Sequence, residues 1–287
     1  TTGLNIRTQC TEGDLALGVQ PENSLSGSVQ DQLVVATQLC ELLLRSLALG
    51  YLDRKVRRFS FIDAAVPYDG ERPLLDLLTA SRTSSPANLP GFVTAGSMMG
   101  AGRRPAVPVQ RLPAPDFSDL PLADYPVLRL PVRSRRGCTW GRCVHCVQLH
   151  PGDRHASACV PPDELVTTME TLAQRTGVND FALANHLTPP EELSGIADAI
   201  LERGAQVSWS SLARFDRKLD LPLLHKLAQA GCRHLHYGLE CIRAEDLSIL
   251  RKGIREDTVR RILDQSGEAG LGAAGSGMSF PGQSPGG

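Results

Sequence analysis

Residues 206–239, QVSWSSLARFDRKLDLPLLHKLAQAGCRHLHYGL, decide the fold of this chain. Residues 206–212 and 232–239 are short apolar runs that predict β-strands; in the first, Trp209 alternates with Val207. Residues 220–231 between them, DLPLLHKLAQAG, predict a helix. Two strands joined by a helix pair in parallel, because the crossover returns the chain to the same end of the sheet.

The same strand–helix unit recurs from residue 127 onward. Strands are predicted at 127–134, 178–184, 206–212, 232–239 and 271–280, and helices at 163–175, 188–204, 220–231 and 243–269. Thr188 and Glu191 predict a capping box at the start of the second helix. Repeated crossovers of this kind predict a parallel sheet in an α/β fold. Five such strands form most of a (β/α) barrel or of an open doubly wound sheet.

The N-terminal part has a weaker α/β pattern. Residues 30–49 predict a helix, residues 59–66 a short strand, and residues 71–80 a helix with Pro73 in its first turn, where a missing N–H costs little. Residues 81–126 are rich in Pro, Ser, Gly and Ala and have no period, which is typical of a linker. The sequence therefore predicts a domain at 1–80, a linker at 81–126 and a second domain at 127–287.

Three cysteines crowd into one loop after the strand predicted at 127–134, in the stretch RRGCTWGRCVHC (135–146). Cys138, Cys143 and Cys146 can each hold one iron of a cubane cluster, which leaves the fourth iron open for a ligand. In barrels of parallel strands, the carboxyl edge where this loop lies carries the active site. The spacing therefore favours a reactive [4Fe–4S] cluster over a structural one.

Two other interpretations of these cysteines remain open at this point. One is a structural zinc site, with a fourth ligand supplied by one of Cys159, His145, His150 and His155. The other is a disulfide pair with one remaining thiol.

The loop and the segments after it resemble the radical S-adenosylmethionine (SAM) enzymes. The loop matches the pattern R-G-C-x-W-G-x-C-x-x-C of one subgroup, although its gaps of four and two residues depart from the commoner three and two. Further likenesses follow in family order: LTPPEEL (187–193), WSSLARFD (209–216), AGCRHLHYGLECIRAEDLSILRKGI (230–254) and MSFPGQ (278–283). The resemblance implies a partial (β/α) barrel of radical SAM type over residues 127–287.

The N-terminal part resembles a cobalamin-binding domain that precedes the barrel in the same subgroup. FIDAAVPYDGERPLLDLL (61–78) is similar to the end of that domain, where Asp-Gly-Glu comes before the last helix. This implies a smaller, incomplete Rossmann-like domain at 1–80, either truncated or degenerate. The family's Asp-x-His-x-x-Gly cobalamin motif is absent from the sequence, so binding of cobalamin and a domain that binds nothing both remain open.

The resemblance also implies roles for individual residues. Cys138, Cys143 and Cys146 would bind the [4Fe–4S] cluster. The residues expected to contact SAM or another cofactor are His145, Asn185, Ser210, Arg214 and Glu240. Three of them have an ordinary alternative: a surface loop position for His145, an ion pair with Asp216 for Arg214, and hydrogen bonds to backbone N–H groups for Glu240.

Composition restricts the classes of partner. The net charge is -1, which does not favour nucleic acid or an anionic membrane. The sequence has no apolar run long enough for a membrane span and no apolar signal region near residue 1, so we expect a cytoplasmic protein. The chain begins without Met and stops at SPGG, and we expect one or both ends of the natural protein to be missing.

The expected function is reductive cleavage of SAM by a radical SAM enzyme. The resemblance favours a cobalamin-type methyltransferase or a tailoring enzyme for peptides or natural products. It implies a small-molecule or peptide substrate and a flavodoxin- or ferredoxin-like electron donor. The alternatives are a cobalamin-independent radical SAM enzyme that performs hydrogen abstraction, cyclisation or rearrangement, and a non-catalytic metal-binding relic.

Overall fold

The computed structural model describes most of the chain from residue 106 onward and shorter segments before it. The described residues are 5–11, 14–20, 56–59, 61–66, 69–80, 88–95, 106–143, 146, 159–241 and 243–277. The helix predicted at 30–49 and the segment 278–283 lie outside these residues.

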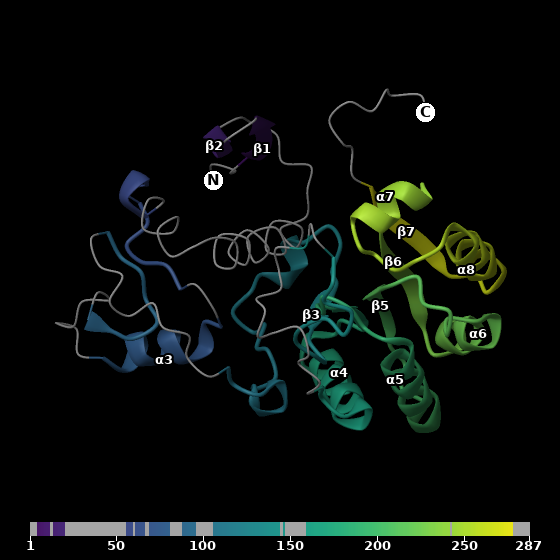
Figure 1. Cartoon of the computed structure of the whole chain (residues 1–287). Coiled ribbons are helices and arrows are strands. Elements are labelled where there is room, and N and C mark those ends of the chain that lie inside the picture. The colour runs from purple at the N-terminus through teal and green to yellow at the C-terminus, as the bar shows by residue number, and fades with distance from the viewer. Residues whose placement is uncertain are drawn as a thin grey trace.

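A five-stranded parallel sheet runs through the later part of the chain, with its strands side by side in chain order (Figure 1). The strands are β3 (Leu130–Val132), β4 (Asp180–Leu183), β5 (Ser208–Ala213), β6 (Cys232–Glu240) and β7 (Gly272–Gly277). A doubly wound sheet reverses its strand order at a switch point, whereas this order runs in one direction. The predicted partial (β/α) barrel is therefore confirmed, and the doubly wound alternative is wrong.

Four helices lie in a row along one side of this sheet (Figure 1). They are α4 (Pro162–Thr176), α5 (Pro190–Arg203), α6 (Leu221–Gln229) and α8 (Glu256–Glu268). α4 and α5 end at Gly177 and Gly204, whose positive φ angles of 74° and 62° are the left-handed conformation that stops a helix. α6 begins at Asp220, whose side chain accepts a hydrogen bond from the Leu223 backbone N–H at 3.0 Å.

The hydrophobic core lies between the sheet and these helices. Alternate strand residues are buried there, and Phe181, Trp209 and Tyr237 are its largest strand side chains. Burying each of them contributes about 1.5–3 kcal/mol. The Trp209 indole N–H donates to the Ala230 carbonyl at 2.9 Å, so its polar atom is satisfied. Within each strand, the residues that alternate with these buried ones lie on the opposite face of the sheet. We call this opposite face the inner face.

The capping box predicted at Thr188 is wrong. α5 begins one residue later, after Pro189, and no side chain caps it. The Thr188 hydroxyl instead accepts hydrogen bonds from Asn185 Nδ2 at 2.9 Å and from Ser211 Oγ at 2.7 Å. These partners on the neighbouring strand ends occupy the oxygen that a cap would need. Glu191 pairs with Lys218 on the surface.

Three other predicted elements differ in extent. The strand predicted at 127–134 is limited to β3, and within the described part of 59–66 there is only one antiparallel bridge, from Ala65 to Val93. The helical stretch predicted at 243–269 is divided into α7 (Ala244–Ile249) and α8. Arg251 and Gly253, with φ angles of 51° and 60°, break the helix between them.

The described N-terminal residues form a hairpin and a helix. β1 (Asn5–Thr11) pairs with β2 (Asp14–Gln20) in antiparallel fashion, and α3 (Glu71–Thr79) confirms the helix predicted at 71–80. The described linker residues hold the short 3-10 helices η2 (Val109–Arg111) and η3 (Leu122–Asp124), besides the bridge at Val93. The Rossmann-like domain and the domain boundaries stay predictions. Across the described residues, no helix is long and apolar enough to cross a membrane.

Candidate functional site

The cysteine loop follows β3 at the carboxyl edge of the sheet, as predicted. Gly137 and Gly141 have positive φ angles of 76° and 58°, which let the loop turn on either side of Cys138. Cys138, Cys143 and Cys146 are all partly exposed thiols. The Cys146 backbone N–H donates to the Cys143 carbonyl at 3.4 Å, which brings the last two cysteines into one turn.

The charges around Cys143 show which groups share this edge. Burial raises the pKa of the Cys143 thiol, and the neighbouring Cys146 and Cys138 raise it further. Lys252 and Arg214 act in the opposite direction and lower that pKa. Three thiols and two cations therefore lie in one neighbourhood, where the cations oppose part of the rise in the pKa of Cys143.

The spacing of the described donors bears on the kind of metal group that the loop could hold. Among the described residues, no three His, Cys, Asp or Glu side chains are grouped closely enough to hold one metal ion. A cubane binds each thiolate to a different iron, so its ligands lie further apart than those of one ion. His145, His150 and His155 lie outside the described residues.

Trp140 attaches the cysteine loop to the connection between α7 and α8. Its indole N–H donates to the Arg251 carbonyl at 3.0 Å, and the Arg214 guanidinium lies 3.8 Å from its ring centroid. A Cβ atom on Gly253 would lie 2.2 Å from the Trp140 ring, so only glycine permits this contact. Beside the contact is a cavity of about 420 Å³, lined by Trp140, Arg142, Leu247, Ser248, Arg251 and Gly253.

Arg214 follows β5 directly and points towards the cysteines. Its guanidinium donates to the Lys252 carbonyl and stacks on Trp140, rather than pairing with Asp216. Burial lowers the pKa of Arg214, and the charges of Cys143, Asp216 and Cys138 raise it. Arg214 therefore lies close enough to Cys143 and Cys138 to feel their charges, and its predicted contact with SAM stays a prediction.

Glu240 ends β6 in a strained conformation beside a buried lysine. Its φ of 63° is rare for a residue with a side chain and is often found at functional sites. Lys252 Nζ lies 3.1 Å from Glu240 Oε1, with side chains only 8% and 14% exposed. Ser276 Oγ donates to the other carboxylate oxygen at 3.4 Å. This ion pair joins the mouth of β6 to the cation that faces Cys143.

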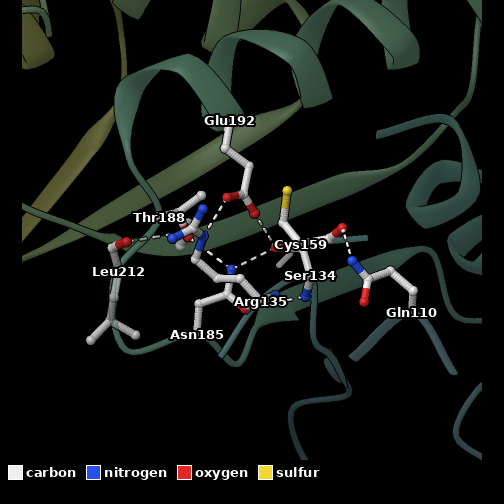
Figure 2. Close-up of polar contacts among 9 residues, drawn as sticks. Gln110, Ser134, Arg135, Cys159, Asn185, Thr188, Glu192 and Leu212 are labelled. Carbon is white, nitrogen blue, oxygen red and sulfur yellow. Dashed lines mark hydrogen bonds and ion pairs between the residues drawn. The ribbon is translucent and has the colours of Figure 1, made fainter. Parts of the chain in front are cut away.

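Asn185 has a structural place that its sequence position did not reveal (Figure 2). Its amide group donates to Ser134 Oγ at 2.7 Å and to Thr188 Oγ1 at 2.9 Å. Its oxygen accepts from the backbone N–H groups of Ser134 and Arg135, both at 3.1 Å. These four bonds use the whole capacity of the amide. Asn185 thus ties the start of the cysteine loop to β4, and these contacts leave it no bond for a cofactor.

The other two predicted cofactor residues are less informative. Ser210 lies in the middle of β5 rather than at its end, and is 3% exposed. His145 lies outside the described residues. Their predicted contacts with SAM stay predictions.

Sequence reasoning missed a buried ion pair beneath the loop (Figure 2). Arg135 Nε lies 2.5 Å from Glu192 Oε2, and Ser134 Oγ donates to Glu192 Oε1 at 2.6 Å. Both charged side chains are 6% exposed. Glu192 sits in the first turn of α5, where a carboxylate is the usual surface choice, so the sequence carried no signal of its burial.

The comparisons with known proteins bear on the fold. No family model matches the chain, and no curated protein does. Among solved structures, the chain is similar to the cobalamin-dependent SAM radical enzyme OxsB with aqua-cobalamin bound, at a TM-score of 0.59 and 16% identity, over 82% of this chain and 36% of that one. It is also similar to the radical SAM methyltransferase TsrM from Kitasatospora setae with cobalamin and a [4Fe–4S] cluster bound, at a TM-score of 0.56 and 21% identity, over 83% of this chain and 51% of that one.

These likenesses define the class of fold. The chain has the partial-barrel fold of radical SAM enzymes, which it shares with OxsB and TsrM, and both of those structures contain cobalamin. The resemblance seen in the sequence is confirmed at the level of the fold. The chain spans between about a third and a half of the length of these structures.

Proposed function

We propose that this chain is a radical SAM enzyme whose Cys138, Cys143 and Cys146 hold a [4Fe–4S] cluster. The observation that carries the proposal is the meeting of three thiols with Arg214 and Lys252 at the carboxyl edge of a singly wound parallel sheet. When bound, the reduced cluster would supply the electron that cleaves SAM to a 5′-deoxyadenosyl radical.

The protein's own groups bind and shield. Lys252 and Arg214 offset the negative charge of three thiolates, and Arg214 is our candidate for the carboxylate of SAM. Glu240 offers a carboxylate to the amino or hydroxyl groups of SAM at the mouth of β6, and Ser210 and His145 remain lesser candidates. The loop held down by Trp140 would keep water from the reacting atoms.

We further propose a cobalamin-type reaction, either methyl transfer or the tailoring of a peptide or natural product. Its support is the shared fold with OxsB and TsrM, whose structures contain cobalamin. Under this proposal residues 1–80 belong to the cobalamin-binding region, and residues 127–287 to the barrel. The substrate would be a small molecule or peptide, a flavodoxin- or ferredoxin-like protein would donate the electron, and a reducing cytoplasm would keep the thiols reduced.

The test is anaerobic reconstitution with iron and sulfide, followed by dithionite, SAM and an assay for 5′-deoxyadenosine. We expect about four irons per chain and product from the wild type, and neither from Cys143→Ala. Cys159→Ala is the matched control, because it removes a fourth ligand from a zinc site but no ligand from the cluster. Zinc bound in place of iron, and lost in Cys159→Ala, would overturn the proposal. Corrinoid that stays with the protein on purification supports the cobalamin reaction, and corrinoid-free SAM cleavage opposes it.

A further inference from the structure

Arg136 lies two residues before Cys138 and reaches back to the N-terminal part of the chain. Its Nη1 lies 2.9 Å from Asp69 Oδ1, and its Nη2 is hydrogen-bonded to Glu71 Oε1. The guanidinium is 12% exposed, and the two acids are 18% and 34% exposed. These partners precede it by 67 and 65 residues, so the contact joins distant parts of the sequence.

The geometry of this contact fixes the orientation of the Arg136 side chain, which a single exposed ion pair would not do. Each terminal nitrogen of one planar guanidinium meets a different carboxylate, which sets the direction of the side chain as well as its distance. Arg136 Nε and Glu71 Oε2 are both shielded from solvent, so the charges interact in a poorly screened setting. In surface pairs such as Lys218–Glu191, with 69% and 61% exposed side chains, water screens the charges and does not fix the direction of the side chains.

The two acids are themselves held at the start of a helix. Asp69 and Glu71 flank Gly70, the N-cap residue of α3, and Glu71 is the first residue of that helix. The positive end of the helix dipole favours carboxylates there. A rigid helix end therefore presents both acceptors to Arg136.

Arg135 and Arg136 attach the loop to two different parts of the protein. Arg135 binds Glu192 of α5, within the barrel, while its neighbour binds the start of α3, outside the barrel. Gly137 follows with a φ of 76°, and Cys138 comes next. The first cysteine is thus placed by contacts on two sides.

We propose that Arg136 is a positioning residue that fastens the cysteine loop to residues 69–71, so that the cluster site is fully formed only with α3 in place. The inference rests on the proposed function, because it concerns the setting of the same cluster. Arg136 acts through the loop and touches neither SAM nor a substrate.

The experiment compares four variants of the full chain. Arg136→Gln removes the loop's side of the contact, and Asp69→Asn/Glu71→Gln removes the side at the start of α3. Arg136→Lys keeps the positive charge but lacks the two terminal nitrogens that bind separate carboxylates. Arg72→Gln is the matched control, because Arg72 is an exposed arginine next to Glu71 on the same helix. Amide hydrogen exchange of residues 134–143 in the metal-free protein measures the attachment without relying on activity. We expect faster exchange in the first two variants, an intermediate rate in Arg136→Lys and no change in Arg72→Gln.

Measurements on the reconstituted protein distinguish an effect of Arg136 on the position of the loop from an effect of its charge on the cluster. Arg136→Gln leaves two uncompensated carboxylates near the cluster and should lower its midpoint potential, whereas Asp69→Asn/Glu71→Gln should raise it. If the contact positions the loop, both variants form 5′-deoxyadenosine about 10- to 100-fold more slowly than the wild type, although their midpoint potentials shift in opposite directions. Combining all three substitutions should add little further loss, since each side already breaks the same contact.

Failure of the inference is distinct from failure of the proposed function. If the wild type cleaves SAM and Arg136→Gln matches it in exchange and rate, Arg136 does not position the loop. If Asp69→Asn/Glu71→Gln cleaves SAM as fast as the wild type, the contact acts through charge alone and the inference is overturned. A wild type that binds no cluster refutes the proposed function, while the exchange measurement still decides the attachment of the loop.

Discussion

At the scale of single residues, the site depends on a close contact between a tryptophan ring and a glycine backbone. Gly253 shows this best, because its backbone lies against the ring of Trp140 in a conformation that side chains rarely adopt. The extra residue in the first cysteine gap brings Trp140 to that place. We infer that the Trp-Gly pair and the Lys252-Gly253 step are two halves of one contact.

Gly253→Ala is predicted to destabilise the protein by about 2–4 kcal/mol, from the clash with Trp140 and from the positive φ angle. Gly267→Ala is the control: Gly267 lies within α8, an added Cβ meets no atom within 4 Å, and the change should stabilise by about 0.5–1 kcal/mol. Urea midpoints of the two variants measure the difference. Equal midpoints would mean that Trp140 does not occupy this place.

Glu192→Gln is predicted to cost about 3–5 kcal/mol, because it leaves the buried Arg135 charge without its carboxylate. Glu191→Gln is the matched control on the same turn of α5, where the pair with Lys218 is exposed and worth less than about 1 kcal/mol. Thermal or urea unfolding of both variants tests this. A small loss in Glu192→Gln would show that the pair is open to water in solution.

At the scale of elements, the sequence predicted what repeats and missed what depends on distant partners. The five strands and the four barrel helices follow from local periodicity and from glycine stops such as Gly177. Thr188 was misassigned because its hydroxyl is taken by Asn185 and Ser211, the second of which is on another strand. No local pattern around Thr188 carries that information.

The candidate site divides in the same way. The cysteines, Arg214 and Glu240 were found because they follow strand ends, and parallel strands bring those ends to one edge. Lys252 was missed because its partner, Glu240, is 12 residues away across a broken helix. The helix predicted at 243–269 had no break, so the prediction hid the turn that brings Lys252 to the mouth of β6.

The inner face of the sheet predicts a dependence of stability on pH. On β6, Leu235 and Tyr237 are buried in the core, so His236 lies on the inner face, where its side chain is exposed to solvent. Partial desolvation, then the charges of His234 and Arg129, lower its pKa. The unfolded state then binds a proton at a pH where the native state does not, so stability falls as the pH drops below about 6.5. His236→Gln should flatten this part of a plot of melting temperature against pH. His225→Gln, at an exposed position on α6, should leave the slope unchanged.

At the scale of the whole molecule, the chain has the same fold as parts of larger enzymes. It matches between a third and a half of the length of OxsB and TsrM. The barrel core does not include Cys138, Cys143 or Cys146, because its buried side chains lie between the sheet and the helices. We therefore expect the metal-free protein to be folded and the cluster to add stability to it.

Reconstitution is predicted to raise the melting temperature by about 5–10 °C, as expected when a tightly bound group favours the native state. Cys143→Ala should show no such rise, and its metal-free form should melt close to the wild type. Anaerobic scanning fluorimetry with and without iron and sulfide measures both. A wild type whose melting temperature does not change with iron and sulfide would contradict the prediction.

Contacts with residues distant in sequence hold the cysteine loop, and three of them bear on the order of folding. Arg136 bonds to a residue 67 positions earlier, while Arg135 and Trp140 bond to residues 57 and 111 positions later. Closing such long loops lowers the entropy of the chain before the free energy of any contact offsets the loss. Contacts of this kind therefore form late. The loop should therefore settle only after α3, α5 and the β6–α8 connection have been assembled. Iron delivered during synthesis would meet an unformed site, and the cell would gain most by loading it once the whole chain has left the ribosome.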